Sequence, residues 1–170
     1  MAAVETARWA RTLRSLHALA SRGIEPGLER VRETLARVGH PERAFEVVQV
    51  AGTNGKGSVS NAVFAGLDEP AGFFSSPHLH SLTERFRVRG VAPIGRADVI
   101  EAWSALEPRL AGPDAPRLTF FEAVTVLAFR LFAARGVRVA VLETGLGGRL
   151  DATNVVGRPL VCALTRVGHD

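Results

Sequence analysis

Apolar residues recur at intervals of three and four in two stretches near the N-terminus, residues 7–21 and 28–38. This spacing places the apolar side chains on one face of a helix. The positions that carry the pattern are Trp9, Leu13, Leu16, Leu19, Leu28, Val31, Leu35 and Val38. Residues 23–27, which include two glycines and a proline, separate the stretches, and Gly39 follows the second. The pattern predicts two amphipathic helices within residues 7–38.

Three further helices are predicted downstream, over residues 58–67, 97–106 and 119–135. The last has the clearest boundaries, because Thr119 is a preferred N-cap, Glu122 occupies the matching capping-box position and Gly136 follows the final turn. Residues 107–117 contain three prolines and predict a surface linker between the second and third of these helices.

Short apolar runs rich in β-branched residues predict buried strands at residues 45–51, 137–142 and 160–165. Residues 72–74 are a weaker strand signal, and residues 79–95 predict a loop with some extended structure. Buried strands that alternate with helices are typical of an α/β fold with a parallel sheet. In such folds ligands bind at the carboxyl edge of the sheet, so the loop after the first strand is the first place to look for a site.

Composition narrows the class of protein. The chain has 170 residues, enough for one domain with a full core, and its 46% hydrophobic and 22% charged residues are ordinary for a globular protein. No apolar run approaches the roughly 18 residues of a membrane-spanning helix, and the N-terminus lacks a secretory signal pattern. The single cysteine, Cys162, cannot form an internal disulfide or a cysteine-based metal site. We therefore expect a cytoplasmic protein with no membrane partner.

The net charge of +4 and the pI of about 10.8 raise nucleic acid as a partner. However, the basic residues are 20 arginines and one lysine, spread along the chain among acidic residues. This distribution favours a dispersed basic surface, and we expect no nucleic-acid partner. The composition also singles out Lys56, the only lysine, as a position that needs a compact ammonium group.

The strongest candidate site is the glycine-rich segment Gly52–Ser58, between the strand predicted at 45–51 and the helix predicted at 58–67. Its glycines allow backbone N–H groups to approach phosphate oxygens, and the start of the helix adds the positive end of a dipole. Lys56 would reach the β- and γ-phosphates, and Ser58 places a hydroxyl in the first helical turn. The spacing is shorter than that of the usual phosphate-binding loop, so a plain turn without a ligand is the alternative.

Five motifs, in order along the chain, resemble the folylpolyglutamate synthase and dihydrofolate synthase branch of the Mur ligase superfamily. They span residues 50–58, 75–79, 83–88, 118–122 and 143–154. The last motif, which begins Glu-Thr-Gly-Leu-Gly-Gly-Arg, distinguishes this branch from the peptidoglycan Mur ligases that share the phosphate loop. The resemblance implies an α/β ATP-binding domain of the P-loop type with a parallel sheet.

Members of this family use ATP to join glutamate to a pteroate or folate carboxylate. The carboxylate attacks the γ-phosphate to form an acyl phosphate, which the amine of L-glutamate then converts to an amide. The resemblance implies ATP and Mg²⁺ as cofactors, with dihydropteroate or folate and L-glutamate as the other small-molecule substrates. It leaves open which of the two synthase activities applies, and an isolated nucleotide-binding module without turnover is the alternative function.

The resemblance also implies roles for particular residues. The residues that would contact ATP are Thr53, Asn54, Gly55, Lys56, Gly57 and Ser58. Lys56 and Glu143 would be the catalytic residues, and Ser76 and Glu143 the magnesium ligands, since Mg²⁺ prefers oxygen donors. Glu143 also attracts attention without the resemblance, because it is a carboxylate that closes a buried strand at the expected sheet edge. The alternatives are a structural Glu143 and an ordinary turn serine at position 76.

Three stretches resemble the pterin-binding parts of the family. Their residues are Glu25, Pro26, Gly27, Leu28, Thr119, Phe120, Phe121, Glu122, Leu150, Asp151 and Ala152. An aromatic ring beside a carboxylate suits a flat heterocycle with amine donors. The alternative is that a phenylalanine packs in the core while Thr119 and Glu122 form only a capping box. His78 is equally compatible with a structural role and with a place in a substrate loop.

The family pattern continues beyond Asp170 with a histidine that is the third magnesium ligand, and later with a carbamylated lysine and a C-terminal domain. We do not transfer the histidine's role to His169, which lies one position short. We expect residues 1–170 to be an ATP-binding domain that is incomplete at its C-terminal end, inactive alone, and monomeric in full-length form. The segment before Ser75 is also shorter than in the family, which predicts a displacement of Ser76.

Overall fold

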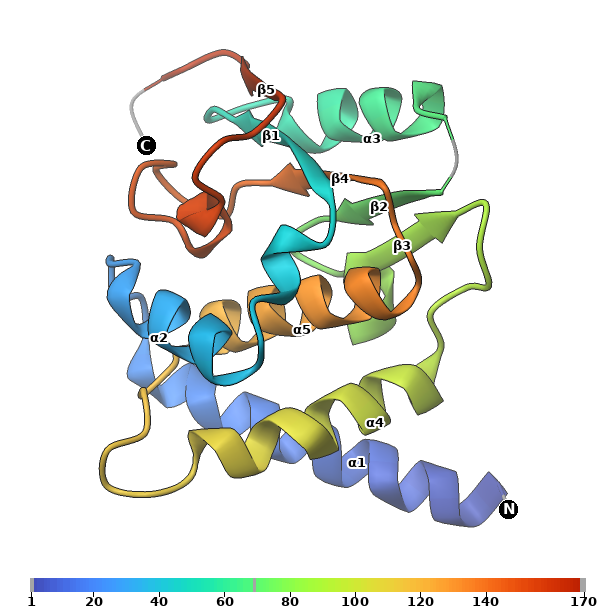
Figure 1. Ribbon diagram of the computed structural model, residues 1–170, viewed down its shortest axis with the longest axis vertical. Coiled ribbons are helices and arrows are strands. Elements are labelled where there is room, and N and C mark those ends of the chain that lie inside the picture. The colour runs from blue at the N-terminus through green and yellow to red at the C-terminus, as the bar shows by residue number, and fades with distance from the viewer. Residues whose placement is uncertain (1, 69, 169–170) are drawn as a thin grey trace.

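A five-stranded sheet with helices on both faces forms the framework of the computed structural model, which describes residues 2–68 and 70–168 (Figure 1). The strands are β1 (Glu46–Ala51), β2 (Ala71–Phe74), β3 (Phe86–Arg89), β4 (Val139–Glu143) and β5 (Val161–Leu164). Their order across the sheet is β3-β2-β4-β1-β5, and all neighbours are parallel except β2 and β3. The expected α/β fold is therefore present, with one antiparallel edge strand.

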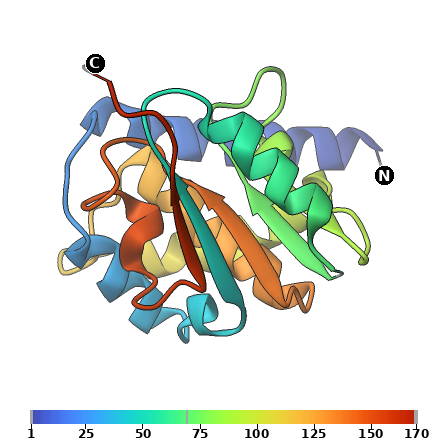
Figure 2. The ribbon, with the colours of Figure 1, turned by 90° about the horizontal axis from the view of Figure 1, so that it is seen from above.

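Five α-helices surround the sheet. They are α1 (Ala2–Ala18), α2 (Glu29–Arg37), α3 (Lys56–Gly66), α4 (Arg96–Leu106) and α5 (Phe120–Ala134). Short 3-10 helices are η1 (Leu19–Arg22), η2 (Pro41–Arg43), η3 (Leu82–Arg85), η4 (Glu107–Leu110) and η5 (Ala152–Val155). Figure 2 shows α3 alone over one face of the sheet, with α1, α4 and α5 behind the other.

Helix α5 lies at the centre of the larger core. Nearly every residue from Glu122 to Phe132 is buried, because the sheet covers one side of the helix and α1, α2 and α4 cover the other. A helix that is apolar on all sides needs such complete coverage. A second, smaller cluster, which includes Phe64 and Phe73, packs between α3 and the sheet. With both faces covered, residues 47–50 of β1 and 140–143 of β4 are buried without the alternation of a half-exposed strand.

The first turn of α5 confirms the capping box predicted from the sequence. The Thr119 hydroxyl accepts a hydrogen bond from the Glu122 N–H at 3.3 Å, and the Glu122 carboxylate accepts one from the Thr119 N–H at 2.7 Å. Both residues are almost completely buried. These bonds satisfy amides that would otherwise lack a partner at a buried helix start.

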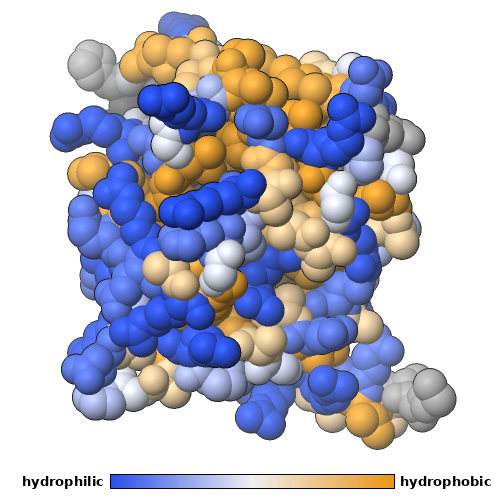
Figure 3. All heavy atoms as spheres, in the orientation of Figure 1, coloured by the Kyte–Doolittle hydropathy of each residue, from blue (hydrophilic) through white to orange (hydrophobic). Residues whose placement is uncertain are grey.

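Two parts of the sheet differ from the sequence-based expectation. Residues 86–89 lie in a segment predicted as a loop with some extended structure, and they form a defined strand, β3, which pairs with β2 to make the antiparallel edge. At the other edge, β5 occupies the predicted place but is not buried, with Val161 53% and Leu164 72% exposed. Hydrophobic surface in Figure 3 gathers in the region of α3 and β5, whereas the surface over α1 and α2 is mainly hydrophilic.

Among the residues that the structure describes, no helix combines the length and apolar character needed to cross a membrane.

Candidate functional site

Three loops meet at the carboxyl edge of the sheet. Residues 52–58 follow β1, residues 75–81 follow β2 and residues 144–151 follow β4. Because β1, β2 and β4 are parallel, with Val50 beside Glu143 and Phe74 beside Leu142, their carboxyl ends lie at one edge. Three of the five motifs found in the sequence are thus brought together by the strand order, as expected for a ligand site in an open α/β sheet.

The phosphate-loop candidate turns directly into α3. Gly55 is the N-cap and adopts a φ of 83°, which favours glycine, and the first helical hydrogen bond runs from the Val59 N–H to the Gly55 carbonyl. The amides of residues 55–58 therefore precede the helical ladder and point along the positive end of the helix dipole. Lys56 lies at the first helical position, where its ammonium group donates to the carbonyls of Gly52 at 2.7 Å and Thr53 at 3.2 Å.

Thr53 and Asn54 are held differently from the rest of this loop. Their N–H groups donate to the Arg166 carbonyl at 2.9 and 3.4 Å, so in this structure they are committed to the segment that follows β5. Gly52 packs against the same segment with a φ of 134°, and a Cβ there would lie 2.0 Å from the Thr165 hydroxyl oxygen. The amides available to a phosphate are thus those of residues 55–58, while Thr53 and Asn54 could contribute side chains.

Glu143 and Ser76, the predicted magnesium ligands, are neighbours. The Ser76 N–H donates to Glu143 Oε2 at 3.3 Å, so the short segment before Ser75 does not separate the two residues. The carboxylate also faces the start of α3, since a Cβ on Gly57 would lie 3.5 Å from Glu143 Oε1. A carboxylate and a hydroxyl beside a helix N-terminus form a donor set of hard oxygens, which fits Mg²⁺. Within residues 2–68 and 70–168, no three His, Cys, Asp or Glu side chains cluster as a metal site, and His169 and Asp170 lie outside the described residues.

Burial dominates the electrostatics of Glu143. The side chain is only 6% exposed, and desolvation raises the pKa of its carboxyl group above the ordinary value. The Ser76 N–H and the positive charges of Lys56 and Arg85 act in the opposite direction without overcoming burial. A bound cation would supply the charge compensation that the protein groups provide only in part.

A cavity of about 630 Å³ opens beside this edge. The predicted pterin-binding residues that line it are Glu25, Pro26, Thr119, Phe120, Phe121, Glu122, Leu150, Asp151 and Ala152, and Ser76 lies on its wall. Gly27 and Leu28 do not line it. The Gly27 N–H instead donates to the Leu150 carbonyl at 3.4 Å, and Leu28 is buried just before α2. Residues from three distant parts of the sequence therefore form one pocket of a size suited to a small molecule.

The two phenylalanines have different environments. Phe121 packs against Phe74 of β2, with 5.9 Å between the ring centroids. Position 145 must be glycine beside it, because a Cβ there would lie 2.7 Å from the Phe121 ring. Phe120 lies between His17 and the guanidinium of Arg85, each under 6 Å from its ring centroid. Both rings pack against the core and also line the cavity, so the structural and ligand-facing interpretations apply together.

Asp151 organises its own loop. Its carboxylate accepts hydrogen bonds from the Leu146 N–H at 2.9 Å, the Thr153 N–H at 3.0 Å and the Thr153 hydroxyl at 2.7 Å. These bonds fold residues 146–153 into a compact turn and leave Leu150 45% exposed at the rim of the cavity.

Arg85 is a cavity residue that the sequence analysis did not single out, although it lies within one of the quoted motifs. It is 6% exposed, lines the cavity, and donates from Nε to His78 Nδ1 at 2.7 Å. This bond needs an unprotonated Nδ1, and burial together with the Arg85 charge lowers the pKa of His78. His78 is therefore neutral and holds Arg85 in place, which favours the structural interpretation of this histidine.

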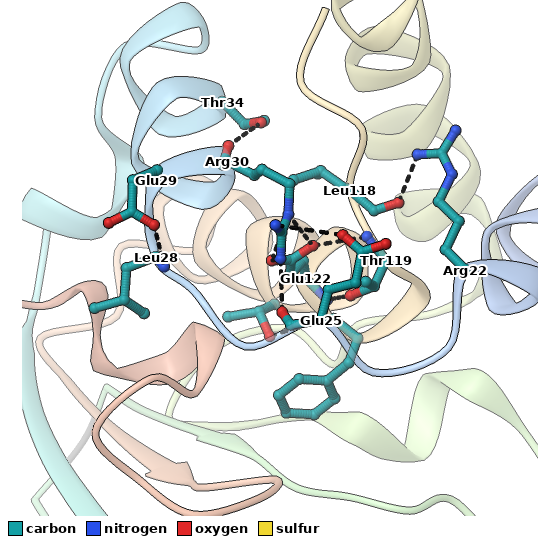
Figure 4. A network of polar contacts seen from close by, with 11 residues as sticks. Arg22, Glu25, Leu28, Glu29, Arg30, Thr34, Leu118, Thr119 and Glu122 are labelled. Carbon is teal, nitrogen blue, oxygen red and sulfur yellow. Dashed lines mark hydrogen bonds and ion pairs between the residues drawn. The ribbon is translucent and has the colours of Figure 1, made fainter.

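Arg30 is a second residue missed in the sequence. From α2, its guanidinium reaches both oxygens of Glu122, the shortest contact being 2.8 Å, and also the Glu25 carbonyl at 2.6 Å (Figure 4). The Glu122 carboxylate thus serves both the helix cap and this ion pair. No local pattern indicates the pairing, because Arg30 and Glu122 are 92 positions apart.

Comparison with known proteins gives a consistent picture of what this chain is similar to. No protein-family profile matches it. The dihydrofolate synthase/folylpolyglutamate synthase of Bacillus subtilis is 40% identical over 166 residues, covering 91% of this chain and 37% of that protein. The Escherichia coli protein of the same name is 42% identical over 172 residues, covering 99% of this chain and 39% of that protein.

Solved structures agree with these relatives. Mycobacterium tuberculosis folylpolyglutamate synthase complexed with ADP matches with a TM-score of 0.82 and 36% identity, over 96% of this chain and 38% of that one. Escherichia coli FolC in complex with DHPP and ADP has a TM-score of 0.81 and 39% identity, over 95% and 39%. A Yersinia pestis bifunctional synthase complexed with AMPPNP and Mn ion has a TM-score of 0.77 and 38% identity, over 92% and 38%. The chain spans less than two fifths of the length of the relatives it matches.

Proposed function

This chain belongs to the folylpolyglutamate synthase/dihydrofolate synthase family and corresponds to the N-terminal part of its relatives. We propose that it carries the nucleotide and pteroate sites of an ATP-dependent ligase. The ligase adds L-glutamate to dihydropteroate, folate or both. The chain is the main part of the ATP-binding domain, with its N-terminal helices within residues 7–38 and its phosphate loop at residues 52–58.

The observation that carries this proposal is the position of Ser76. It lies on the wall of the 630 Å³ cavity, and its N–H contacts Glu143 at the edge that holds the phosphate loop. A ligase that forms an acyl phosphate must bring the substrate carboxylate and the γ-phosphate together in one place. A residue shared by the apolar cavity and the phosphate edge supports that arrangement.

In the proposed reaction, the phosphate loop holds the nucleotide. The amides of residues 55–58 bind phosphate oxygens, and the ammonium of Lys56 leaves the carbonyls of Gly52 and Thr53 to contact the β- and γ-phosphates. Phosphoryl transfer depends mainly on positioning and on neutralising charge, so these groups act without forming covalent bonds to the substrate. The relatives crystallised with ADP or AMPPNP support a nucleotide as the ligand of this loop.

Glu143 and Ser76 would hold the divalent ion in this proposal. A bound Mg²⁺ supplies positive charge to the transferring phosphoryl group. The pteroate ring system occupies the cavity between the Phe120 and Phe121 walls, and the buried Arg85 offers a positive charge near its carboxylate end. The Escherichia coli complex with DHPP and ADP supports the pairing of these two ligand classes.

Residues 1–170 correspond to only part of the relatives, which bears on the activity expected of them alone. Since the chain spans less than two fifths of its relatives, we propose that residues 1–170 bind ligands but do not form the amide bond alone. The full-length protein is proposed to be a cytoplasmic monomer that acts on small molecules rather than on nucleic acid.

Titration calorimetry of the 170-residue chain tests the proposal. ADP with Mg²⁺ and dihydropteroate are each expected to bind at one site per chain, while a glutamylation assay gives no amide product. Binding of nucleotide without dihydropteroate would favour the alternative of an isolated nucleotide-binding module. The absence of both binding events would refute the proposed function.

A further inference from the structure

Residues 23–26 form one wall of the cavity and belong to a segment, residues 23–28, that has no regular secondary structure. Gly23, Ile24, Glu25 and Pro26 line the cavity, and Ile24 is 77% exposed. Such a segment has few apolar contacts of its own to fix its position, so its polar contacts decide where the wall stands.

Two arginines tie this wall to the start of α5 from either end (Figure 4). Before the segment, Arg22 Nη1 donates to the Leu118 carbonyl at 2.9 Å. After it, Arg30 Nη2 donates both to Glu122 Oε1 at 2.8 Å and to the Glu25 carbonyl at 2.6 Å, while Nη1 lies 3.3 Å from the Glu25 carboxylate. Arg30 therefore joins Glu25, in the middle of the wall, to Glu122 of α5.

The chemistry of Arg30 suits this double contact. The Glu122 side chain is 5% exposed and the Arg30 side chain 27%, so the pair is shielded from solvent, whereas the Glu25 side chain is 50% exposed. Hydrogen bonding to Glu122 raises the pKa of Arg30, which keeps the guanidinium charged. A planar guanidinium can serve the carboxylate and the carbonyl at once, which the smaller ammonium of lysine does poorly.

A third contact links the same wall to the opposite side of the cavity. The Gly27 N–H donates to the Leu150 carbonyl at 3.4 Å, and Leu150 belongs to the loop organised by Asp151. This bond is long, so it cannot hold the wall as firmly as the Arg30 contacts.

We propose that Arg30 is a positioning residue that locks residues 23–28 against α5 and thereby sets the width of the cavity for a pteroate-class ligand. The ligand class rests on the proposed function, whereas the locking of the wall does not. Arg30 acts through Glu25 and Glu122 and does not itself line the cavity.

The test compares R30M/E122Q with E122Q. Removing Arg30 alone would leave a buried carboxylate unpaired and could unfold the chain, whereas glutamine at position 122 removes that charge and can still accept the Thr119 N–H. Three quantities are measured in each variant: hydrogen exchange of the backbone amides in residues 23–28, calorimetric affinity for dihydropteroate, and calorimetric affinity for ADP. R32M is the surface control, because Arg32 lies on the same helix and pairs only loosely with Glu29 at 3.9 Å.

Relative to E122Q, R30M/E122Q is expected to exchange the wall amides at least tenfold faster and to bind dihydropteroate at least tenfold more weakly, with ADP affinity within twofold. R32M should match the wild type in amide exchange and in both affinities. R30K should lie between the wild type and R30M/E122Q in amide exchange and in dihydropteroate affinity. Unchanged exchange overturns the proposal, and so does faster exchange with unchanged dihydropteroate affinity. If the wild-type chain itself fails to bind dihydropteroate, the proposed function is lost, and the exchange rates alone decide whether Arg30 locks the wall.

Discussion

The phosphate loop and the cavity beside it depend on the sequence to different degrees. Lys56 makes local contacts, with carbonyls three and four positions earlier. Thr53 and Asn54 are also bonded to the carbonyl of Arg166 in the segment that follows β5. The cavity depends on contacts across the chain, such as the pairing of Arg30 with Glu122 over 92 positions. The phosphate loop therefore combines a turn that a short motif encodes with an anchor to the segment after β5, whereas the cavity is an assembly of side chains that exists only in the folded domain.

This contrast predicts how each site responds to change. A substitution in the phosphate loop should affect backbone geometry or phosphate charge and leave the cavity intact. A substitution in the cavity wall should alter affinity for the second ligand with little effect on nucleotide binding. Ser76 and Glu143, which lie where the two sites meet, are the positions where both properties should change.

The largest effect is expected for Gly52→Ala. Its φ of 134° is strained for alanine, and the new Cβ would lie 2.0 Å from the Thr165 hydroxyl oxygen, which also bonds the Ala51 carbonyl. Strain and overpacking together should lower the free energy of unfolding by about 3 kcal/mol. Urea unfolding measures the loss. Gly66→Ala, at a helical position with no atom within 4 Å of the added Cβ, is the control and should not destabilise the chain. Equal stability of the two variants would contradict the account of Gly52.

Lys56→Ala should separate the two sites most clearly. A charge-assisted contact from an ammonium to phosphate is worth roughly 1.5–3 kcal/mol, so ADP affinity should fall about ten- to a hundredfold while dihydropteroate affinity stays the same. Calorimetry with each ligand measures both. If the variant binds ADP as tightly as the wild type, Lys56 does not belong to a phosphate site.

Much of the phosphate edge could be predicted because its signals are local. Apolar runs indicated β1 and β4, the glycines and Lys56 indicated the loop, and Glu143 followed from its position at the end of a strand. For residues 79–95 only some extended structure was predicted. The bounds of β3 and the 3-10 turn of η3 were not, because β3 has only four residues and depends on pairing with β2.

The cavity was predicted only through the family resemblance, and its supporting residues were missed. Arg30 looks like one of many surface arginines in a sequence with 20 of them, and its partner is set by how α2 packs against α5. Arg85 lies inside a recognised motif, but it is buried beside residues distant in the sequence, such as Phe120 of α5, whose ring centroid is 5.6 Å from its guanidinium. Long-range packing of this kind leaves no periodic signal in the sequence.

Glu143→Gln tests the boundary between the two sites. Glutamine keeps the shape and can still accept the Ser76 N–H, but it lacks the charge that balances a divalent ion. The gain in ADP affinity on adding Mg²⁺ should therefore fall by roughly tenfold, while affinity measured with a metal chelator stays unchanged. Equal losses with and without Mg²⁺ would make Glu143 a structural residue.

The smallest expected effect is on stability without metal. Burial raises the pKa of Glu143 above that of the unfolded chain, so the folded state binds the proton more tightly. Ionisation of Glu143 therefore lowers the free energy of unfolding as the pH rises. The loss is absent below the pKa of Glu143 in the unfolded chain and complete above its raised pKa in the folded chain. Glu143→Gln should be more stable than the wild type at neutral pH, with the difference vanishing in acid. Urea midpoints across pH measure this, and a difference independent of pH would point to packing instead.

The central claim is that the phosphate edge and the cavity form a single ligase site joined at Ser76 and Glu143. Paramagnetic relaxation tests it directly, with Mn²⁺ and ADP added to the chain and dihydropteroate present. Mn²⁺ is a suitable probe because one relative, from Yersinia pestis, was crystallised with AMPPNP and Mn ion. The account predicts that Mn²⁺ broadens the proton signals of the benzoate ring of dihydropteroate more strongly than those of its pterin ring. Mg²⁺, which is diamagnetic, should broaden neither set of signals. Absence of this gradient, or displacement of dihydropteroate by the nucleotide, would contradict a shared site.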